Sequence, residues 1–345
     1  MALLWRQELF AGGKPQHLKD CLVPLLLAHR TEVAGVNLPN KAKGELPELL
    51  QHVRQLRTAL PQAKDLDICV HYSVNANYDH TPEASFAILT NFCLELAELR
   101  CSLLLVSGGG PRKRLNSLAA LERIELSPAW SRLQLPLAVA YNPYFPDAAR
   151  RQEEEGRLRA KLVNGGGRIR AVYLQAGSDV PRLEQGLKVL QDLLEELGLS
   201  GGQQQAGQQD GQQQQNVQQD GRQQPGAGDA PAQQRSGGQP PPAARPAKRQ
   251  RQQSQQQQAP QRQPVRVYGS VLVPSKKQLA AMRFRPWGGV FLSDAYLSSV
   301  EAADAITRRL VSVYADHGVL PLVETAVESE SDVTRVRQLL QVASN

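Results

Sequence analysis

Polar side chains follow several apolar segments of this sequence, at the points where those segments end. Glu8, His71 and Glu324 are ionisable, and each lies at or near the end of a strand-like segment. The carboxyl ends of parallel strands meet at one edge of a sheet or barrel, where α/β proteins build their active sites. A barrel would bring together at one mouth Glu8, Asn37, His71, Ser73, Ser107, Gly108, Gly109, Gly110, Tyr141, Gln175 and Glu324.

Each of these residues also has a simpler structural explanation. His71 and Gln175 could be hydrogen-bonded structural residues, and Gly108 to Gly110 could form a tight turn instead of a phosphate cradle. The three glycines are not followed by the Lys-Ser/Thr of a P-loop. No Ser-His-Asp or Cys-His nucleophile arrangement stands out, and we expect no metal site. The functional interpretation therefore depends on the convergence of the whole group.

Eight strand-like segments alternate with helical ones along the chain. The expected strands are 2–10, 33–38, 67–73, 101–107, 135–140, 169–175, 265–273 and 319–324. Helical periodicity or capping indicates helices at 17–29, 45–60, from 81 onward, and at 148–163, 179–197, 275–282, 297–317 and 331–342. This order predicts a (β/α)8 TIM barrel. A doubly wound sheet gives a similar pattern, but eight units are more than an open sheet usually carries, and 289–293 is a competing strand.

Residues 201–264 differ in composition from the rest of the chain. They are almost wholly Gln, Gly, Pro, Ala and Arg, with no aromatic residue. Such a segment buries too little apolar surface to offset its ordering entropy, so we expect a disordered insert between the sixth helix and the seventh strand. The barrel would then be one discontinuous domain of residues 1–200 and 265–345. A long insertion is compatible with this domain because closure entropy grows only logarithmically with length.

The charge of the chain comes largely from this insert. Its seven basic and three acidic residues contribute +4 of the formal net charge of +7. The remaining net charge of +3 does not indicate nucleic-acid binding by the folded part. The basic cluster in 240–251 could be a nuclear-import signal, but a solvated linker is the favoured interpretation.

Cysteine usage and hydropathy indicate a cytoplasmic protein. The four cysteines lie in apolar segments without a CxxC pair, as expected for thiols in a reducing compartment. The sequence contains no apolar stretch of 18 residues, so we expect no membrane span. The N-terminal apolar segment is too short for a secretory signal, and charged residues interrupt it too early. A homo-oligomer is possible.

The order and spacing of these segments resemble the methylenetetrahydrofolate reductase family, the flavin-dependent barrels of one-carbon metabolism. The similarity runs from about residue 7 to residue 329, interrupted by the insert, and consists of seven short matches in order. Glu8-Leu9-Phe10 resembles the family's Glu-Phe-Phe, and Val70 to Ser73 its His-x-Thr. The other matches are residues 104–111, 138–147, the pair Glu154 and Lys161, residues 173–175 and residues 267–279.

The resemblance implies hydride transfer from NADH or NADPH to FAD, and from reduced FAD to 5,10-methylenetetrahydrofolate. It implies Glu8 as general acid for opening the folate ring and Gln175 as a folate-binding residue. The implied FAD-binding residues are Asn37, His71, Ser73, Gly108, Gly109, Gly110, Tyr141, Glu154 and Lys161.

The sequence departs from the family pattern at three places. Gly108 to Gly110 stand where the family has Arg-Gly-Asp, Ala11-Gly12-Gly13 replaces Pro-Pro, and Phe145 replaces a common His. Two alternatives therefore stay open. One is a barrel of the same descent that binds flavin or folate without efficient reductase activity. The other is an unrelated barrel enzyme such as an aldolase, for which Lys41 is the nearest candidate lysine.

Overall fold

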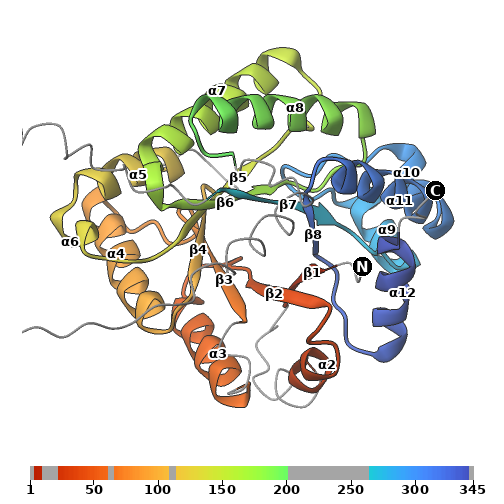
Figure 1. The fold of residues 1–345 in the computed structure, drawn as a ribbon, viewed down its shortest axis with the longest axis horizontal. Helices are drawn as coiled ribbons and strands as arrows, with labels where there is room; N and C mark the ends of the chain where they lie inside the picture. The colour runs from red at the N-terminus through yellow and green to blue at the C-terminus, as the bar shows by residue number, and fades with distance from the viewer. Residues whose placement is uncertain (1–3, 10–21, 61–65, 109–113, 201–263, 342–345) are drawn as a thin grey trace, which may run out of the picture. The chain divides into compact units, whose positions relative to one another are not determined.

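Eight parallel strands close into a barrel in sequence order, from β1 to β8 (Figure 1). The computed structural model describes residues 4–9, 22–60, 66–108, 114–200 and 264–341, and the statements below concern those residues. The strands are β1 (Trp5–Glu8), β2 (Val33–Leu38), β3 (Asp67–Ser73), β4 (Ser102–Val106), β5 (Leu137–Tyr141), β6 (Ile169–Leu174), β7 (Arg266–Val271) and β8 (Leu320–Val323). Pairing of β1 with β8 completes the ring. The predicted (β/α)8 barrel is confirmed, and the doubly wound alternative is wrong.

Helices surround this barrel and follow the strands along the chain (Figure 1). They are α2 (Val23–Ala28), α3 (Leu46–Ala59), α4 (Pro82–Glu98), α5 (Ser117–Leu126), α6 (Pro128–Ser131), α7 (Ala148–Gly165), α8 (Val180–Glu196), α9 (Lys276–Phe284), α10 (Asp294–Ser298), α11 (Val300–Asp316) and α12 (Glu330–Leu340), with a 3-10 turn η2 (Gly166–Arg168). The sequence interpretation assigned no helix at α5 or α6. None of the described helices combines the length and apolar character needed to cross a membrane.

Local capping explains why several helices begin where they do. The Thr81 hydroxyl accepts a hydrogen bond from the Ala84 N–H at the start of α4, where Pro82 costs no helical hydrogen bond. Ser275 and Gln278 form a reciprocal capping box at the start of α9. The competing strand at 289–293 is instead an isolated bridge between Phe291 and Gly177.

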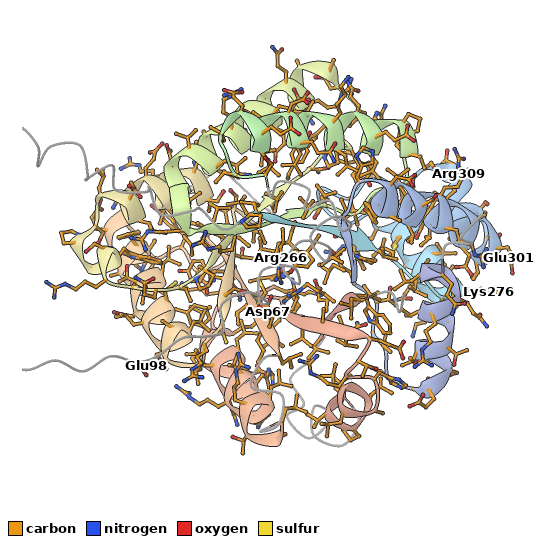
Figure 2. The ribbon with its side chains drawn as sticks, in the orientation of Figure 1. Asp67, Glu98, Arg266, Lys276, Glu301 and Arg309 are labelled. Carbon is orange, nitrogen blue, oxygen red and sulfur yellow. The ribbon has the colours of Figure 1, made fainter. Side chains whose placement is uncertain are left out.

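Strand residues alternate between the barrel interior and the helix layer. The interior cluster is small and consists of Cys69, Leu104, Ala138, Ala171, Tyr173, Tyr268 and Leu322. A much larger cluster lies between the sheet and the helices, so most of the apolar burial stabilises the outer shell. Charged side chains such as Glu98, Lys276, Glu301 and Arg309 lie on the surrounding helices (Figure 2). Cys69, Cys93 and Cys101 are buried free thiols, as predicted, whereas Cys21 lies outside the described residues.

The predicted insert enters and leaves the barrel at one point. The backbone N–H of Val265 donates a hydrogen bond to the Leu199 carbonyl, with 3.0 Å between nitrogen and oxygen. This bond joins the chain after α8 to the chain before β7. Residues 201–263 of the insert lie outside the described residues. A long segment can therefore be inserted here without separating β6 from β7.

Candidate active site

Two glutamates lie in register at the carboxyl ends of neighbouring strands. Glu8 ends β1, and Glu324 follows β8 directly; the pairing of Gln7 with Val323 brings the two next to each other. Glu8 is 6% exposed, and the Ser270 hydroxyl on β7 donates a hydrogen bond to Glu324. The mouth of the barrel therefore contains a carboxyl pair built by its first and last strands.

Burial and mutual repulsion favour a proton on this pair. Burial raises the pKa of Glu8 well above its ordinary value, the neighbouring Glu324 raises it further, and Lys41 acts in the opposite direction. Burial likewise raises the pKa of Glu324, against the Ser270 hydrogen bond and Lys41. Lys41 Nζ lies 3.9 Å from a Glu8 carboxyl oxygen. A carboxyl group that remains protonated at a pH at which isolated carboxyl groups are ionised is suited to act as a general acid.

His71 and Asn37 form the adjoining wall of the mouth. Asn37 Nδ2 lies 2.9 Å from His71 Nε2, and both side chains come from the inward-facing positions of β2 and β3. Burial, with added repulsion from Lys41 and Arg6, lowers the pKa of His71 to about 3. The imidazole is therefore neutral at physiological pH and brings a dipole, without a positive charge, to the mouth.

The ends of β3 and β4 approach closely at Ser73 and Gly108. Gly108 has φ of +79°, and a Cβ there would lie 2.1 Å from Ser73 Oγ. The Gly108 carbonyl accepts a hydrogen bond of 3.2 Å from Asn75 Nδ2. Glycine is the residue that suits this position, because a side chain would meet both the left-handed backbone conformation and Ser73 Oγ. Gly109 and Gly110 lie outside the described residues.

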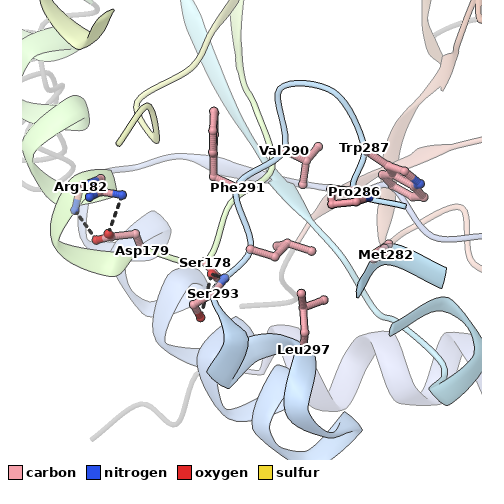
Figure 3. A pocket seen from close by; sticks show the side chains of 11 residues that line it. Ser178, Asp179, Arg182, Met282, Pro286, Trp287, Val290, Phe291, Ser293 and Leu297 are labelled. Carbon is pink, nitrogen blue, oxygen red and sulfur yellow. Dashed lines mark hydrogen bonds and ion pairs between the residues drawn. The ribbon is translucent and has the colours of Figure 1, made fainter. Parts of the chain in front are cut away.

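A loop after α9 borders the opposite side of the mouth. A Cβ on Gly289 would lie 3.4 Å from the Gln175 amide nitrogen, and Asn142 Nδ2 donates a 2.9 Å hydrogen bond to the Gly289 carbonyl. Beside this loop is a cavity of about 290 Å³. Figure 3 shows Trp287, Phe291 and Met282 among its apolar lining residues, with the Arg182–Asp179 ion pair at its polar end. Gln175 thus lies against this loop, but neither it nor the glutamate pair lines the cavity.

Three of the predicted flavin-binding residues lie behind the sheet. The Tyr141 side chain belongs to the outer apolar cluster, and a Cβ on Gly186 of α8 would lie 3.2 Å from its hydroxyl. Lys161 Nζ donates a 2.7 Å hydrogen bond to the Ala140 carbonyl and lies 3.6 Å from Glu154.

Glu154 and Lys161 are 8% and 7% exposed, so these two charges neutralise each other within the fold. Tyr141, Glu154 and Lys161, which the resemblance assigns to FAD binding, do not face the mouth. Of the other predicted flavin-binding residues, His71 and Ser73 lie at the mouth, whereas Asn37 is 0% exposed and both ends of its amide are bonded, to Arg6 and to His71.

The sequence interpretation missed the contributions of Arg6 and Ser270. Period-two alternation could have indicated Arg6, because it lies two residues before Glu8 and shares its inward face. Ser270 was hidden inside an apolar segment. Among the described residues, no group of three His, Cys, Asp or Glu side chains is arranged to hold a metal ion.

Comparison with known families and with curated proteins finds no match to this chain. Comparison with solved structures finds matches of low similarity. An endoglucanase of the GH5-4 type from an uncultured bacterium has a TM-score of 0.45 at 10% identity, covering 95% of this chain and 85% of that one. Dihydropteroate synthase from Xanthomonas albilineans has a TM-score of 0.42 at 12% identity, covering 99% and 94%.

The homocysteine methyltransferase MmuM from Escherichia coli has a TM-score of 0.30 at 10% identity, covering 98% of this chain and 96% of its own. All three names are those of enzymes. Scores and identities this low carry no argument about the activity of this chain, and the barrel itself is established by its own strand pairing.

Proposed function

We propose that this barrel is a reductase of the methylenetetrahydrofolate reductase type, with 5,10-methylenetetrahydrofolate as substrate. The observation that carries the proposal is the buried pair of Glu8 and Glu324 at the mouth, where the sequence resemblance requires a general acid. Gln175, on the opposite side of the mouth, would bind the pterin through its amide.

The carboxyl pair supplies a proton to the substrate. Opening of the five-membered folate ring breaks a C–N bond, and the departing nitrogen needs a proton as the iminium carbon forms. Glu8 would donate that proton from its carboxyl group. Donation leaves two neighbouring carboxylates, whose repulsion is reduced by the Lys41 ammonium at 3.9 Å and by the Ser270 hydroxyl on Glu324. The same arrangement favours reprotonation of Glu8 before the next turnover.

A flavin bound at the mouth would supply the hydride, with NADH or NADPH as the source of electrons. His71 and Ser73 would hydrogen-bond its ring, and buried Asn37 would hold His71 in place. Because Glu154 and Lys161 are buried against each other, phosphate anchoring has to come from other residues. The same observation favours a second candidate, a barrel of the same descent that binds folate without efficient reductase activity.

Flavin content and single-turnover kinetics test the proposal. We expect purified protein to be yellow or to become yellow with added FAD, to bleach with NADH or NADPH, and to reoxidise with 5,10-methylenetetrahydrofolate. Glu8→Gln should retain flavin and its reduction but slow folate-dependent reoxidation by roughly 100- to 10,000-fold, the usual contribution of a general acid. Glu98→Gln, on the exposed surface of α4, is the matched control.

Two outcomes would contradict the proposed reductase function. Protein that neither contains nor takes up FAD is not a flavin reductase, and measured folate binding to that protein would support the second candidate. Unchanged reoxidation in Glu8→Gln would remove Glu8 from the reaction.

A further inference from the structure

A buried arginine lies beneath the mouth and contacts the wall that contains His71. Arg6 is 1% exposed, and its guanidinium lies 4.9 Å from the centre of the Tyr268 ring. It donates hydrogen bonds to the Asp67 carboxylate at 2.5 Å and to the Val36 carbonyl at 3.0 Å. Gly35 makes room for it, because a Cβ there would lie 2.6 Å from an Arg6 nitrogen. Arg6 is therefore held rigidly inside the barrel.

Another Arg6 contact, with Asn37, fixes the orientation of an amide. Arg6 Nε donates to Asn37 Oδ1 at 2.8 Å, and an arginine N–H can only donate. The Asn37 amide must therefore turn its oxygen toward Arg6 and its Nδ2 toward His71. The amide oxygen and nitrogen have nearly the same shape, so the orientation is assigned from which partner can donate and which can accept.

The amide orientation in turn fixes the tautomer of His71. Asn37 Nδ2 can only donate, so His71 Nε2, at 2.9 Å, must accept. In a neutral imidazole with an accepting Nε2, the proton is on Nδ1. The cations Arg6 and Lys41 and the burial of the ring all disfavour a second proton, and they lower the pKa of His71 to about 3. His71 thus has one N–H group, on the nitrogen that does not contact Asn37.

We propose that Arg6 and Asn37 are positioning residues that hold His71 as a neutral Nδ1–H donor, and that the ligand at the mouth offers it a hydrogen-bond acceptor. The acceptor would be a carbonyl oxygen or an unprotonated nitrogen of a heterocyclic ring. His71 binds and orients such a ligand and transfers no proton. The ligand part rests on the function proposed above, whereas the tautomer is a property of the free protein.

Nitrogen-15 NMR of the unliganded protein measures the tautomer directly. The chain has six histidines, and His71→Gln identifies the signal of His71 by its loss. We expect the Nδ1–H tautomer and no titration between about pH 5 and pH 8, the range in which ordinary histidines change charge. Asn37→Asp replaces the donating amide nitrogen with an accepting oxygen, so we expect the His71 proton to move to Nε2.

Asn142→Asp is the matched control because it introduces the same charge change in the loop after β5. Asn142 contacts the Gly289 carbonyl and the Tyr144 N–H, and the His71 tautomer should not change in this variant. In wild-type protein, an Nε2–H tautomer or a titration between about pH 5 and pH 8 would overturn the inference. Should Asn37→Asp fail to fold, the wild-type spectrum alone decides.

Adding FAD or 5,10-methylenetetrahydrofolate tests the ligand part. A shift of the His71 Nδ1 signal with either probe supports an acceptor docked on that nitrogen, and no shift with either refutes it. The tautomer is measured without ligand, so that result stands even if the reductase proposal fails.

Discussion

Substitution of Gly108 by alanine provides a quantitative test of the close approach between β3 and β4. With φ of +79°, an alanine would adopt a left-handed backbone conformation, at a cost of about 1–2 kcal/mol. Its Cβ would also lie 2.1 Å from Ser73 Oγ, and overpacking of this kind costs about 1–3 kcal/mol. We therefore expect Gly108→Ala to lower the free energy of unfolding by about 2–5 kcal/mol in total.

Gly44→Ala separates the two contributions. Gly44 has a similar φ of +87°, but no atom lies within 4 Å of the position its Cβ would take. It should cost only the backbone contribution of about 1–2 kcal/mol. Each substitution also reduces the entropy of the unfolded chain by a similar amount, which cancels in the comparison. The difference between the two variants therefore measures the overlap with Ser73.

A second substitution identifies the atom responsible. Ser73→Ala removes Oγ and leaves the Ser73 Cβ 3.4 Å from the new methyl group, an ordinary contact. In the Ser73→Ala background, Gly108→Ala should therefore cost about 1–3 kcal/mol less. Urea denaturation followed by circular dichroism measures each variant. The reasoning is refuted if Gly108→Ala costs no more than Gly44→Ala, or if Ser73→Ala does not reduce its cost.

Other expectations follow from the site and its surroundings. Because Glu324 raises the pKa of Glu8, Glu324→Gln should move the alkaline limb of the turnover profile to lower pH; an unmoved limb contradicts the coupling. Burial raises the pKa values of Glu8 and Glu324 in the folded protein, so the free energy of unfolding that they contribute is fully present below the ordinary pKa of 4.5 and is lost as pH rises through the folded-state pKa values. Glu324→Gln should therefore flatten the decline of Tm with pH. Replacing 201–263 by a short Gly-Ser turn should change Tm little, because the flanking residues are hydrogen-bonded; a large fall would give the insert a structural role. Trp287 is 43% exposed, so Trp287→Phe should remove most of the tryptophan emission that acrylamide quenches, whereas retained quenching would contradict the placement of this loop.

Much of the architecture could be predicted because each strand has its own sequence signals. β2 and β3 begin and end where periodicity and flanking breakers indicate. The sequence predicts Glu8 and Glu324 near the ends of strands 2–10 and 319–324, and the structure ends those strands at Glu8 and Val323. The side of the sheet taken by Tyr141 could not be predicted. Its strand is apolar at every position because both faces are buried, so alternation gives no indication of which residues point inward.

The buried charges show a second limit of sequence reasoning. Alternation indicates that Arg6 faces inward, but an isolated charge is costly to bury, so its burial is not expected without a partner. That partner, Asp67, lies on another strand, and only the folded chain brings the two together. Glu154 and Lys161 lie on one helix and could be paired from their spacing, whereas spacing cannot identify a partner on another strand.

The interior of the barrel explains how one mouth can hold acidic and neutral groups side by side. On β1, inward Arg6 lies one pleat below Glu8, and its charge is balanced by Asp67 at the opposite end of the barrel. Its positive field disfavours a proton on His71, while Glu324 favours one on Glu8. The two neighbouring walls therefore have opposite protonation behaviour: the β8–β1 wall can release a proton, and the β2–β3 wall can only donate a hydrogen bond. A substrate bound between them would be protonated from one side and oriented from the other.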